Sequence, residues 1–293
     1  MAKQPSSNKE FSVHRVQFLI QKTLFPTSAI LPPKSEFMRT VLEDSARSAR
    51  YRSGQKKWVI THPSIVEMID GTYLVGTLGY IKDRPANVYD YEKLEFKTER
   101  TTDAELLRFV FDGERELVAI QTSPVFADRH VLEMFEQLFG MANPEIRKNR
   151  VLAIYPVTSG SNLIAQVYEE PVRRFIAEIR RPNAKLSGQF EKYFAPLQAE
   201  NNSDRVEVTW WSKAENLFEN AGGALMAAVG VAEAGFGSWI AWVRTKSGKL
   251  QKIRSSESSM RRILDANTDE TLAATASATF REIDAKVEDS DQG

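Results

Sequence analysis

Two Asp-Gly dipeptides, each lying between runs rich in β-branched and aromatic residues, constrain the fold most. They are Asp70-Gly71 and Asp112-Gly113. Asp-Gly tolerates the positive φ angles of a tight turn, so each dipeptide predicts a β-hairpin. Six strands are expected on this basis: Phe11 to Gln21, Lys57 to Met68, Thr72 to Ile81, Leu94 to Glu99, Leu106 to Phe111 and Leu117 to Thr122. The N-terminal half is therefore predicted to be an antiparallel sheet.

Two helices are expected in the same half. Lys34 to Arg52 follows a Pro-broken segment and reads as a helix. His130 to Phe139 places apolar residues at helical spacing, which predicts a helix packed across the sheet. The polar segment Asn143 to Asn149 contains Pro144 and is the candidate linker.

The pattern of the C-terminal half is mixed. Strands are expected at Arg150 to Val157, Val172 to Ile179 and Arg205 to Trp211, where Val206, Val208 and Trp210 alternate on one face. The expected helices are Asn162 to Glu169, Phe190 to Leu197, Ala214 to Ala234 as the longest, and Ser258 to Val287 at the end. A hairpin joins Trp239 to Thr245 and Lys249 to Arg254 about Ser247-Gly248.

These elements predict an α+β protein of two domains. The first, residues 11–142, is a mainly antiparallel β domain with a packed helix. The second, residues 150–287, is an α+β domain with a long helix, a basic hairpin and a terminal helix. Residues 1–10 and 288–293 are polar and are expected to be disordered tails.

Composition excludes several classes of site. The chain of 293 residues has no Cys, so it has no disulfide, thiolate nucleophile or Cys-ligated zinc. Its three His residues are too scattered for a metal or triad motif, and we expect no cofactor. The polar start and the lack of an apolar run of about 18 residues predict a cytoplasmic protein without a membrane span.

Charge is segregated, although 39 Lys and Arg residues balance 39 Asp and Glu residues. Residues 244–262 carry seven cations and one acid, whereas residues 263–293 carry eight acids and two cations. Salt screens exposed charges beyond about 8 Å, so a polyanion meets a local patch rather than the net charge. A neutral chain of this kind can therefore bind nucleic acid.

The basic hairpin is the first candidate nucleic-acid site. Its cations are Arg244, Lys246, Lys249, Lys252 and Arg254. Lys252 and Arg254 share one strand face, and Trp239 and Trp242 can stack bases if they lie outside the core. The alternative is a solvated hairpin neutralised by the acidic terminal helix. In that arrangement, deleting Asp284 to Gly293 is expected to strengthen DNA binding.

Two further cationic groups are candidates. One is interleaved with Tyr51 and Trp58 and comprises Arg47, Arg50, Arg52, Lys56 and Lys57; the alternative is a helix C-terminus enriched in cations for dipole reasons. The other flanks one strand and comprises Arg173, Arg174, Arg180 and Arg181. For this group the alternative is an intramolecular partner for Glu169, Glu170 or Glu178.

One motif is compatible with catalysis. Glu95-Phe96-Lys97 matches the Glu-x-Lys of metal-dependent nucleases, in which carboxylates hold Mg²⁺ and the lysine stabilises developing charge. Asp83 or Asp90 would supply the second carboxylate. The glycines at 222, 223 and 230 show no phosphate-binding pattern, so a nucleotide loop is not expected.

The layout of the chain resembles the RexA phage-exclusion protein and related bacterial defence-associated families. The stretches that carry the resemblance are IDGTYLVGTLGY, LLRFVFDGERELVAIQTSPVF with its helix VLEMFEQLF, VRRFIAEIRRPN, and WIAWVRTKSGKLQKIRSSES. The resemblance implies a two-domain, dimeric, DNA-binding defence protein without known catalysis. The main hypothesis is thus a DNA-binding protein that acts by occupancy or sensing. The alternatives are a protein-interaction component of a defence complex and a metal-dependent nuclease.

Overall fold

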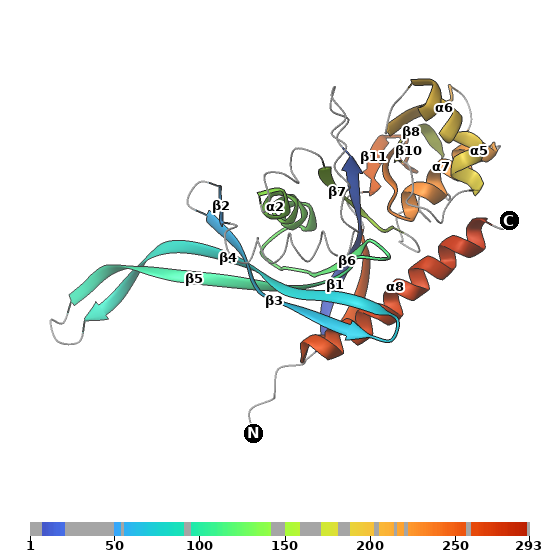
Figure 1. Ribbon diagram of the computed structural model, residues 1–293. Helices are drawn as coiled ribbons and strands as arrows, with labels where there is room; N and C mark the ends of the chain where they lie inside the picture. The colour runs from blue at the N-terminus through green and yellow to red at the C-terminus, as the bar shows by residue number, and fades with distance from the viewer. Residues whose placement is uncertain are drawn as a thin grey trace.

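The computed structural model has an α+β fold with two antiparallel sheets, here called sheet A and sheet B (Figure 1). It describes residues 8–20, 50–53, 56–90, 95–141, 150–158, 171–180, 188–201, 205–213, 216–219, 222–255 and 259–291. The predicted linker, the helix at 162–169, most of the helix at 34–52 and residues 1–7 of the predicted N-terminal tail lie outside these residues.

Sheet A runs in the order β12-β1-β6-β5-β4-β3-β2, with β7 also paired to β1. Its strands are β1 (Asn8–Ile20), β2 (Arg50–Ser53), β3 (Lys56–Met68), β4 (Gly71–Asp90), β5 (Glu95–Asp112), β6 (Leu117–Gln121), β7 (Arg150–Pro156) and β12 (Met260–Asp265). One edge of β1 pairs with β12 along its first half and with β7 along its second half. Strands β7 and β12 lie in residues 150–287, the predicted second domain, yet they belong to the same sheet as the strands of residues 11–142.

Both hairpins predicted from Asp-Gly in this sheet are confirmed. β3 returns as β4 across Ile69 and Asp70, with Met68 paired to Gly71. In the β5–β6 turn, the Asp112 carboxylate accepts hydrogen bonds from the backbone N–H groups of Glu114 and Arg115, at 2.9 and 3.0 Å. This local satisfaction of turn donors is why Asp is favoured at the position.

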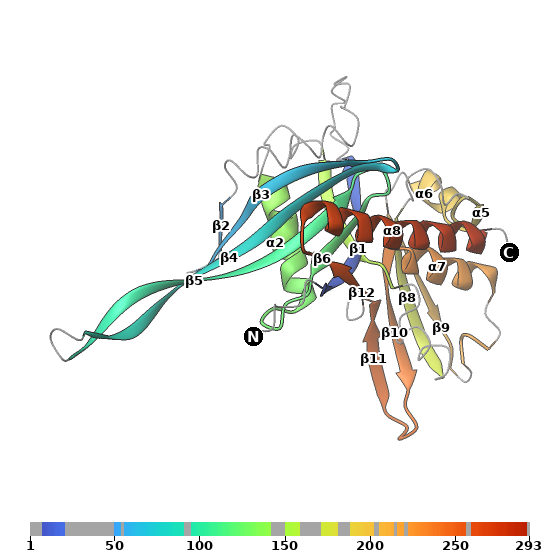
Figure 2. The ribbon, with the colours of Figure 1, turned by 90° about the horizontal axis from the view of Figure 1, so that it is seen from below.

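One strand prediction was wrong in its extent. The segments Leu94 to Glu99 and Leu106 to Phe111 belong to one strand, β5, which pairs with β4 without interruption from Asp90–Glu95 to Tyr73–Asp112. Beyond Lys82, β4 pairs with β5 alone, and this ribbon projects from the body of the molecule (Figures 1 and 2). Backbone pairing with β4 runs through the polar residues 98–103, so these residues do not end the strand.

Sheet A is covered on both faces. The helix α2 (Asp128–Met141), predicted at His130 to Phe139, packs with Phe135 against Phe109 and Leu78. The helix α8 (Asp269–Asp291) covers the opposite face, where Phe280 packs against Tyr73. Strand residues alternate between these two cores, as period-two side chains require.

Sheet B has the order β11-β10-β8-β9. Its strands are β8 (Val172–Arg180), β9 (Arg205–Trp211), β10 (Gly237–Arg244) and β11 (Leu250–Arg254). One face is buried beneath the helices α5 (Gly188–Tyr193), α6 (Ala195–Asn201) and α7 (Gly223–Glu233). The predicted helix at Phe190 to Leu197 is thus divided between α5 and α6.

The longest helix was predicted in the wrong place. Helix α7 begins only at Gly223, because Gly222 is extended and Asn216 ties the preceding segment to β8 by accepting a hydrogen bond from Val172 N. The longest described helix is instead α8, and its predicted start at Ser258 was also wrong. Met260–Asp265 forms β12 on the edge of β1, and reciprocal hydrogen bonds between Thr268 and Thr271 begin the helix.

The predicted helix ending at Arg52 required a further correction. Arg50–Ser53 forms strand β2, paired with β3 so that Arg50 lies opposite Val59 and Arg52 opposite Lys57. The cations there are therefore strand residues, and an account based on a helix dipole does not apply to them.

Candidate nucleic-acid interface

The predicted basic hairpin is confirmed as β10 and β11. Gly248 adopts φ +81 in its turn, a conformation that L side chains rarely adopt. On β11, Lys252 and Arg254 are exposed on the face opposite the buried Ile253. Leu250 shares their face and is 59% exposed. The predicted common face of Lys252 and Arg254 is therefore present and open.

Only one of the two candidate stacking residues lies on this face. Trp239 is 1% exposed and stacks on Phe175 in the core, with ring centroids 5.8 Å apart. Trp242 lies on the other face of β10, away from the helices. Its ring centroid is 4.9 Å from Arg174 Cζ and 5.2 Å from Lys252 Nζ, both within cation–π range.

Strand register extends this arrangement across the whole sheet. Lys252 pairs with Trp242, Trp242 with Arg174, and Arg174 with Trp211, so cations and indoles alternate over the four strands. Trp211 is 62% exposed, and Lys213 Nζ lies 5.5 Å from its ring centroid. We call Lys252, Trp242, Arg174 and Trp211 the cation–indole row.

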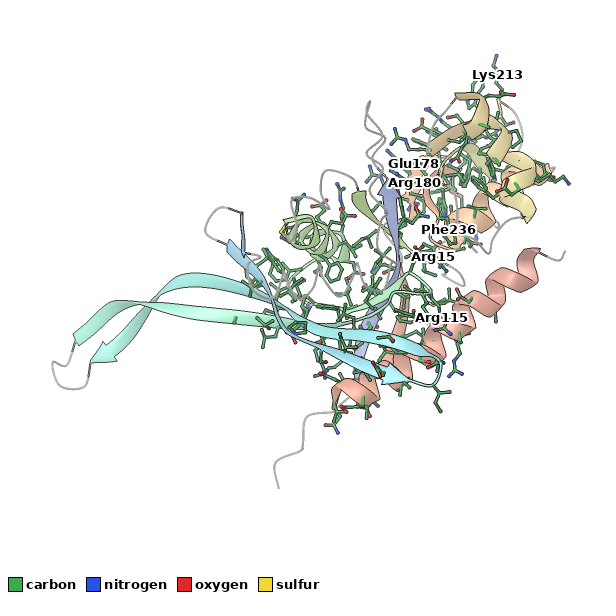
Figure 3. All side chains as sticks on the ribbon, in the orientation of Figure 1. Arg15, Arg115, Glu178, Arg180, Lys213 and Phe236 are labelled. Atoms are coloured by element: carbon green, nitrogen blue, oxygen red, sulfur yellow. The ribbon has the colours of Figure 1, made fainter. Side chains whose placement is uncertain are left out.

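The far end of the same face is closed by an ionic cluster. Glu178 accepts from Arg180 at 3.3 Å and from Arg205 at 3.5 Å, and it also accepts a hydrogen bond from the Tyr155 hydroxyl. Burial raises the pKa of Tyr155 to about 12. Arg180 thus pairs with Glu178, one of the intramolecular partners considered for this group of arginines. Arg174 instead lies in the cation–indole row, beside Trp242. Figure 3 shows Lys213 well away from Glu178 and Arg180.

Two acids in the C-terminal part of α8, Glu282 and Asp284, pair with arginines of β1, β12 and the β5–β6 turn rather than with the hairpin. Asp284 contacts Arg15 at 3.4 Å and Arg115 at 3.7 Å, and Glu282 contacts Arg262 at 3.1 Å. Within the described ranges, no carboxylate lies within 4 Å of the hairpin cations Arg244, Lys246, Lys249 and Lys252. These cations therefore keep their positive field toward solvent.

The second predicted cluster belongs to another surface. Arg50, Arg52, Lys56 and Lys57 lie in β2 and at the start of β3, while Arg47 is outside the described residues. Trp58 beside them is fully buried against Tyr80 and Phe126, so it cannot stack a base. Strand β2 and sheet B lie far apart in both ribbon views. The two clusters therefore do not form one continuous surface.

The possible nuclease motif lies on the projecting ribbon. Register pairs Asp90 directly with Glu95, whereas Asp83, seven positions earlier on β4, pairs with Thr102. Of the two aspartates considered, only Asp90 is a neighbour of Glu95. The described part of the chain contains no group of three or more His, Asp or Glu residues able to hold a metal ion.

Sequence reasoning missed Trp211 and Lys213. The signal was present in the alternation of β9, because Val206, Val208 and Trp210 are partly buried on one face and Trp211 therefore lies on the opposite face. What the sequence could not supply was the neighbour, since Arg174 and Trp211 are 37 positions apart and meet only through register.

Comparison with known families gives a match over most of the chain. The family model described as a domain of unknown function (DUF4747) matches residues 34–283, which include all of sheet B. The chain belongs to the DUF4747 family. A search of curated proteins finds no match. Within the described residues of this DUF4747 protein, no helix is both long and apolar enough to cross a membrane.

Proposed function

We propose that this DUF4747 protein binds DNA through the open face of sheet B and acts by occupancy or sensing, without turnover. The observation that supports it best is the exposed cationic face of sheet B, where Lys252 has no carboxylate within 4 Å among the described residues and lies with Arg174 beside the ring of Trp242. Six cations lie on the hairpin and on the neighbouring strand β8: Arg174, Arg244, Lys246, Lys249, Lys252 and Arg254.

Electrostatic attraction to phosphates would supply most of the affinity. Lysine and arginine on a strand face contact phosphates without reading sequence, so little base specificity is expected. The cation–π contacts of Trp242 keep Arg174 and Lys252 beside one ring, which lowers the entropy lost when they meet a phosphate.

The biological setting is a further part of the proposal. The resemblance to RexA-like families supports a role in anti-phage defence or phage exclusion, in the cytoplasm and as a homodimer. A defence-system protein partner fits the same setting.

The test is the salt dependence of binding to a fluorescein-labelled duplex of mixed sequence. Six phosphate contacts predict a slope of log affinity against log salt of about −5, at roughly 0.9 per contact. The double variant Lys252→Ala/Arg254→Ala should bind more weakly and reduce the slope by about two. The matched control is Arg129→Ala, which removes a cation that is 76% exposed on α2. A DNA affinity that does not change with salt concentration would contradict the proposal.

A second candidate function is that of a protein-interaction component of a defence complex, favoured by the β4–β5 ribbon. After Lys82 on β4 and before Phe109 on β5, the two ribbon strands pair only with each other among the described strands. Unpaired strand edges can accept a strand from another chain. Replacing residues 84–101 by a short turn should abolish capture of that partner and leave DNA affinity unchanged. Loss of DNA binding in this variant would contradict the division of roles.

A further inference from the structure

The open face of sheet B carries more aromatic surface than phosphate binding requires. Trp211 leaves 62% of its surface exposed, whereas Trp58 and Trp239 are almost fully buried. Leu250 is 59% exposed on the same side of the hairpin. A face that met only phosphates would gain nothing from an indole held in water, because exposed apolar area forgoes the hydrophobic stabilisation of burial.

The row places planar groups and cations side by side. Strands lie about 4.8 Å apart, so a row over four strands spans about 14 Å. In duplex DNA the bases are stacked on each other and their faces are covered, whereas an unpaired strand offers its base faces to aromatic rings and guanidinium planes.

We infer that the open face of sheet B binds single-stranded DNA, with a base stacked on Trp211 and phosphates paired with Lys252, Arg254 and Lys213. This inference rests on the proposed function and names its substrate class. Trp211 is the stacking residue because its ring is the more exposed of the two. Trp242 is a positioning residue that holds Arg174 and Lys252 at 4.9 and 5.2 Å from its ring centroid.

The Glu178 cluster limits the site at one end. Glu178 and Glu207 lie opposite each other on the same face, and Glu178 is paired with Arg180 and Arg205. These carboxylates repel phosphates. We therefore expect the single-stranded DNA to cross the β-strands of sheet B near Trp211 rather than to follow the β-strands along their full length.

The experiment measures anisotropy of fluorescein-labelled dT12, U12 and a 12-base-pair duplex at one salt concentration. The parent protein should bind dT12 more tightly than the duplex. Trp211→Leu should weaken dT12 binding roughly ten- to a hundredfold, because stacking on one base contributes about 1–3 kcal/mol. Duplex affinity should stay within twofold, and Trp211→Phe should restore part of the dT12 affinity.

Controls separate stacking from folding and charge. Ile263→Ala removes an apolar side chain of similar exposure, 63%, from sheet A and should leave dT12 binding unchanged. Lys252→Ala/Arg254→Ala should weaken dT12 and duplex together. Tryptophan fluorescence should be quenched by dT12 in the parent and less so in Trp211→Leu, and the thermal unfolding midpoints of the two proteins should agree.

The outcomes distinguish this inference from the proposed function. Equal affinity for dT12 and duplex, or an unaffected Trp211→Leu variant, overturns the single-strand inference while salt-dependent duplex binding sustains the proposed function. Binding of U12 but not dT12 overturns the assignment to DNA. Absence of binding to all three probes overturns both.

Discussion

Replacing Arg15 by Met should destabilise the protein more than any surface change, because Arg15 joins both sheets. Its side chain is 5% exposed on β1. Nε donates to the Ala234 carbonyl oxygen after α7 at 2.7 Å, and Nη1 donates to the Arg115 carbonyl oxygen at 2.8 Å. Nη2 lies 3.4 Å from the Asp284 carboxylate, and the guanidinium is 4.4 Å from the ring centroid of Phe236 (Figure 3).

The expected loss follows from these contacts. Hydrogen bonds from a charged donor contribute about 1.5–3 kcal/mol each, and breaking a buried ion pair by removing one partner costs about 3–5 kcal/mol. Met fills part of the volume but leaves the buried Ala234 carbonyl and the partly buried Arg115 carbonyl without their donor. We therefore expect the free energy of unfolding of Arg15→Met to fall by about 3–5 kcal/mol. Arg15→Lys keeps the charge but cannot span both carbonyls, so its loss should be intermediate.

Urea denaturation followed by circular dichroism at 222 nm and by tryptophan fluorescence measures this loss. With an m-value of about 3 kcal/mol/M, the midpoint should fall by roughly 1 to 2 M. Arg129→Ala is the control, since its exposed ion pair with Glu133 should contribute no more than about 0.5 kcal/mol. An Arg15→Met variant within 1 kcal/mol of the parent would refute the idea that this arginine holds the two sheets together.

Two further predictions concern pH and backbone packing. Burial raises the pKa of Glu233 to about 7. The folded state therefore keeps a proton that the unfolded state releases, and stability falls by up to about 3 kcal/mol as pH rises from about 4.5 to about 7. Glu233→Gln should remove this fall in the free energy of unfolding, measured by urea titrations at pH 5 and 8. Burial lowers the pKa of His14 to about 3, so the loss of stability that His14 causes on acidification should remain. In Gly237→Ala, the new Cβ would overlap the Glu178 carbonyl oxygen where β10 meets β8. This variant should lose about 1–3 kcal/mol of unfolding free energy in a thermal melt, and an unchanged melting midpoint would show that the strands can separate locally.

Local chemistry predicted the hairpins of this fold well. Asp112 satisfies its own turn donors, and Gly248 supplies the positive φ of the basic hairpin, so both turns are decided within a few residues. The α+β class and the amphipathic helix α2 followed from the same short-range periodicity.

Long-range pairing was beyond the reach of such patterns. The sequence predicts a helix from Ser258, whereas Met260–Asp265 forms strand β12. It is extended because it pairs with β1, about 250 positions earlier in the chain. Tertiary contacts routinely override local propensity in this way. The candidate site shows the same division. The cations of the hairpin were visible in the sequence, but the row required the register that brings Arg174 and Trp211 beside Trp242.

The acidic end of α8 gives the last prediction, because its placement bears on whether the hairpin is neutralised. In Figures 1 and 2 the C-terminal end of α8 lies beside α5 and α7, on the helical side of sheet B, and the tip of the hairpin points away from it. Asp284 is held by Arg15 and Arg115 in sheet A. Exposed charges more than about 8 Å apart are largely screened at physiological salt.

Deleting residues 288–293 should therefore change DNA affinity less than twofold at 150 mM salt. Deleting from Asp284 onward should instead lower stability, since it removes the carboxylate that faces the buried Arg15. Anisotropy titrations of both truncations against the same duplex, with urea denaturation alongside, check these outcomes. If the shorter deletion strengthened binding more than about fivefold, the acidic segment would be neutralising the hairpin after all, and the positive field assigned to the open face of sheet B would be masked in the intact chain.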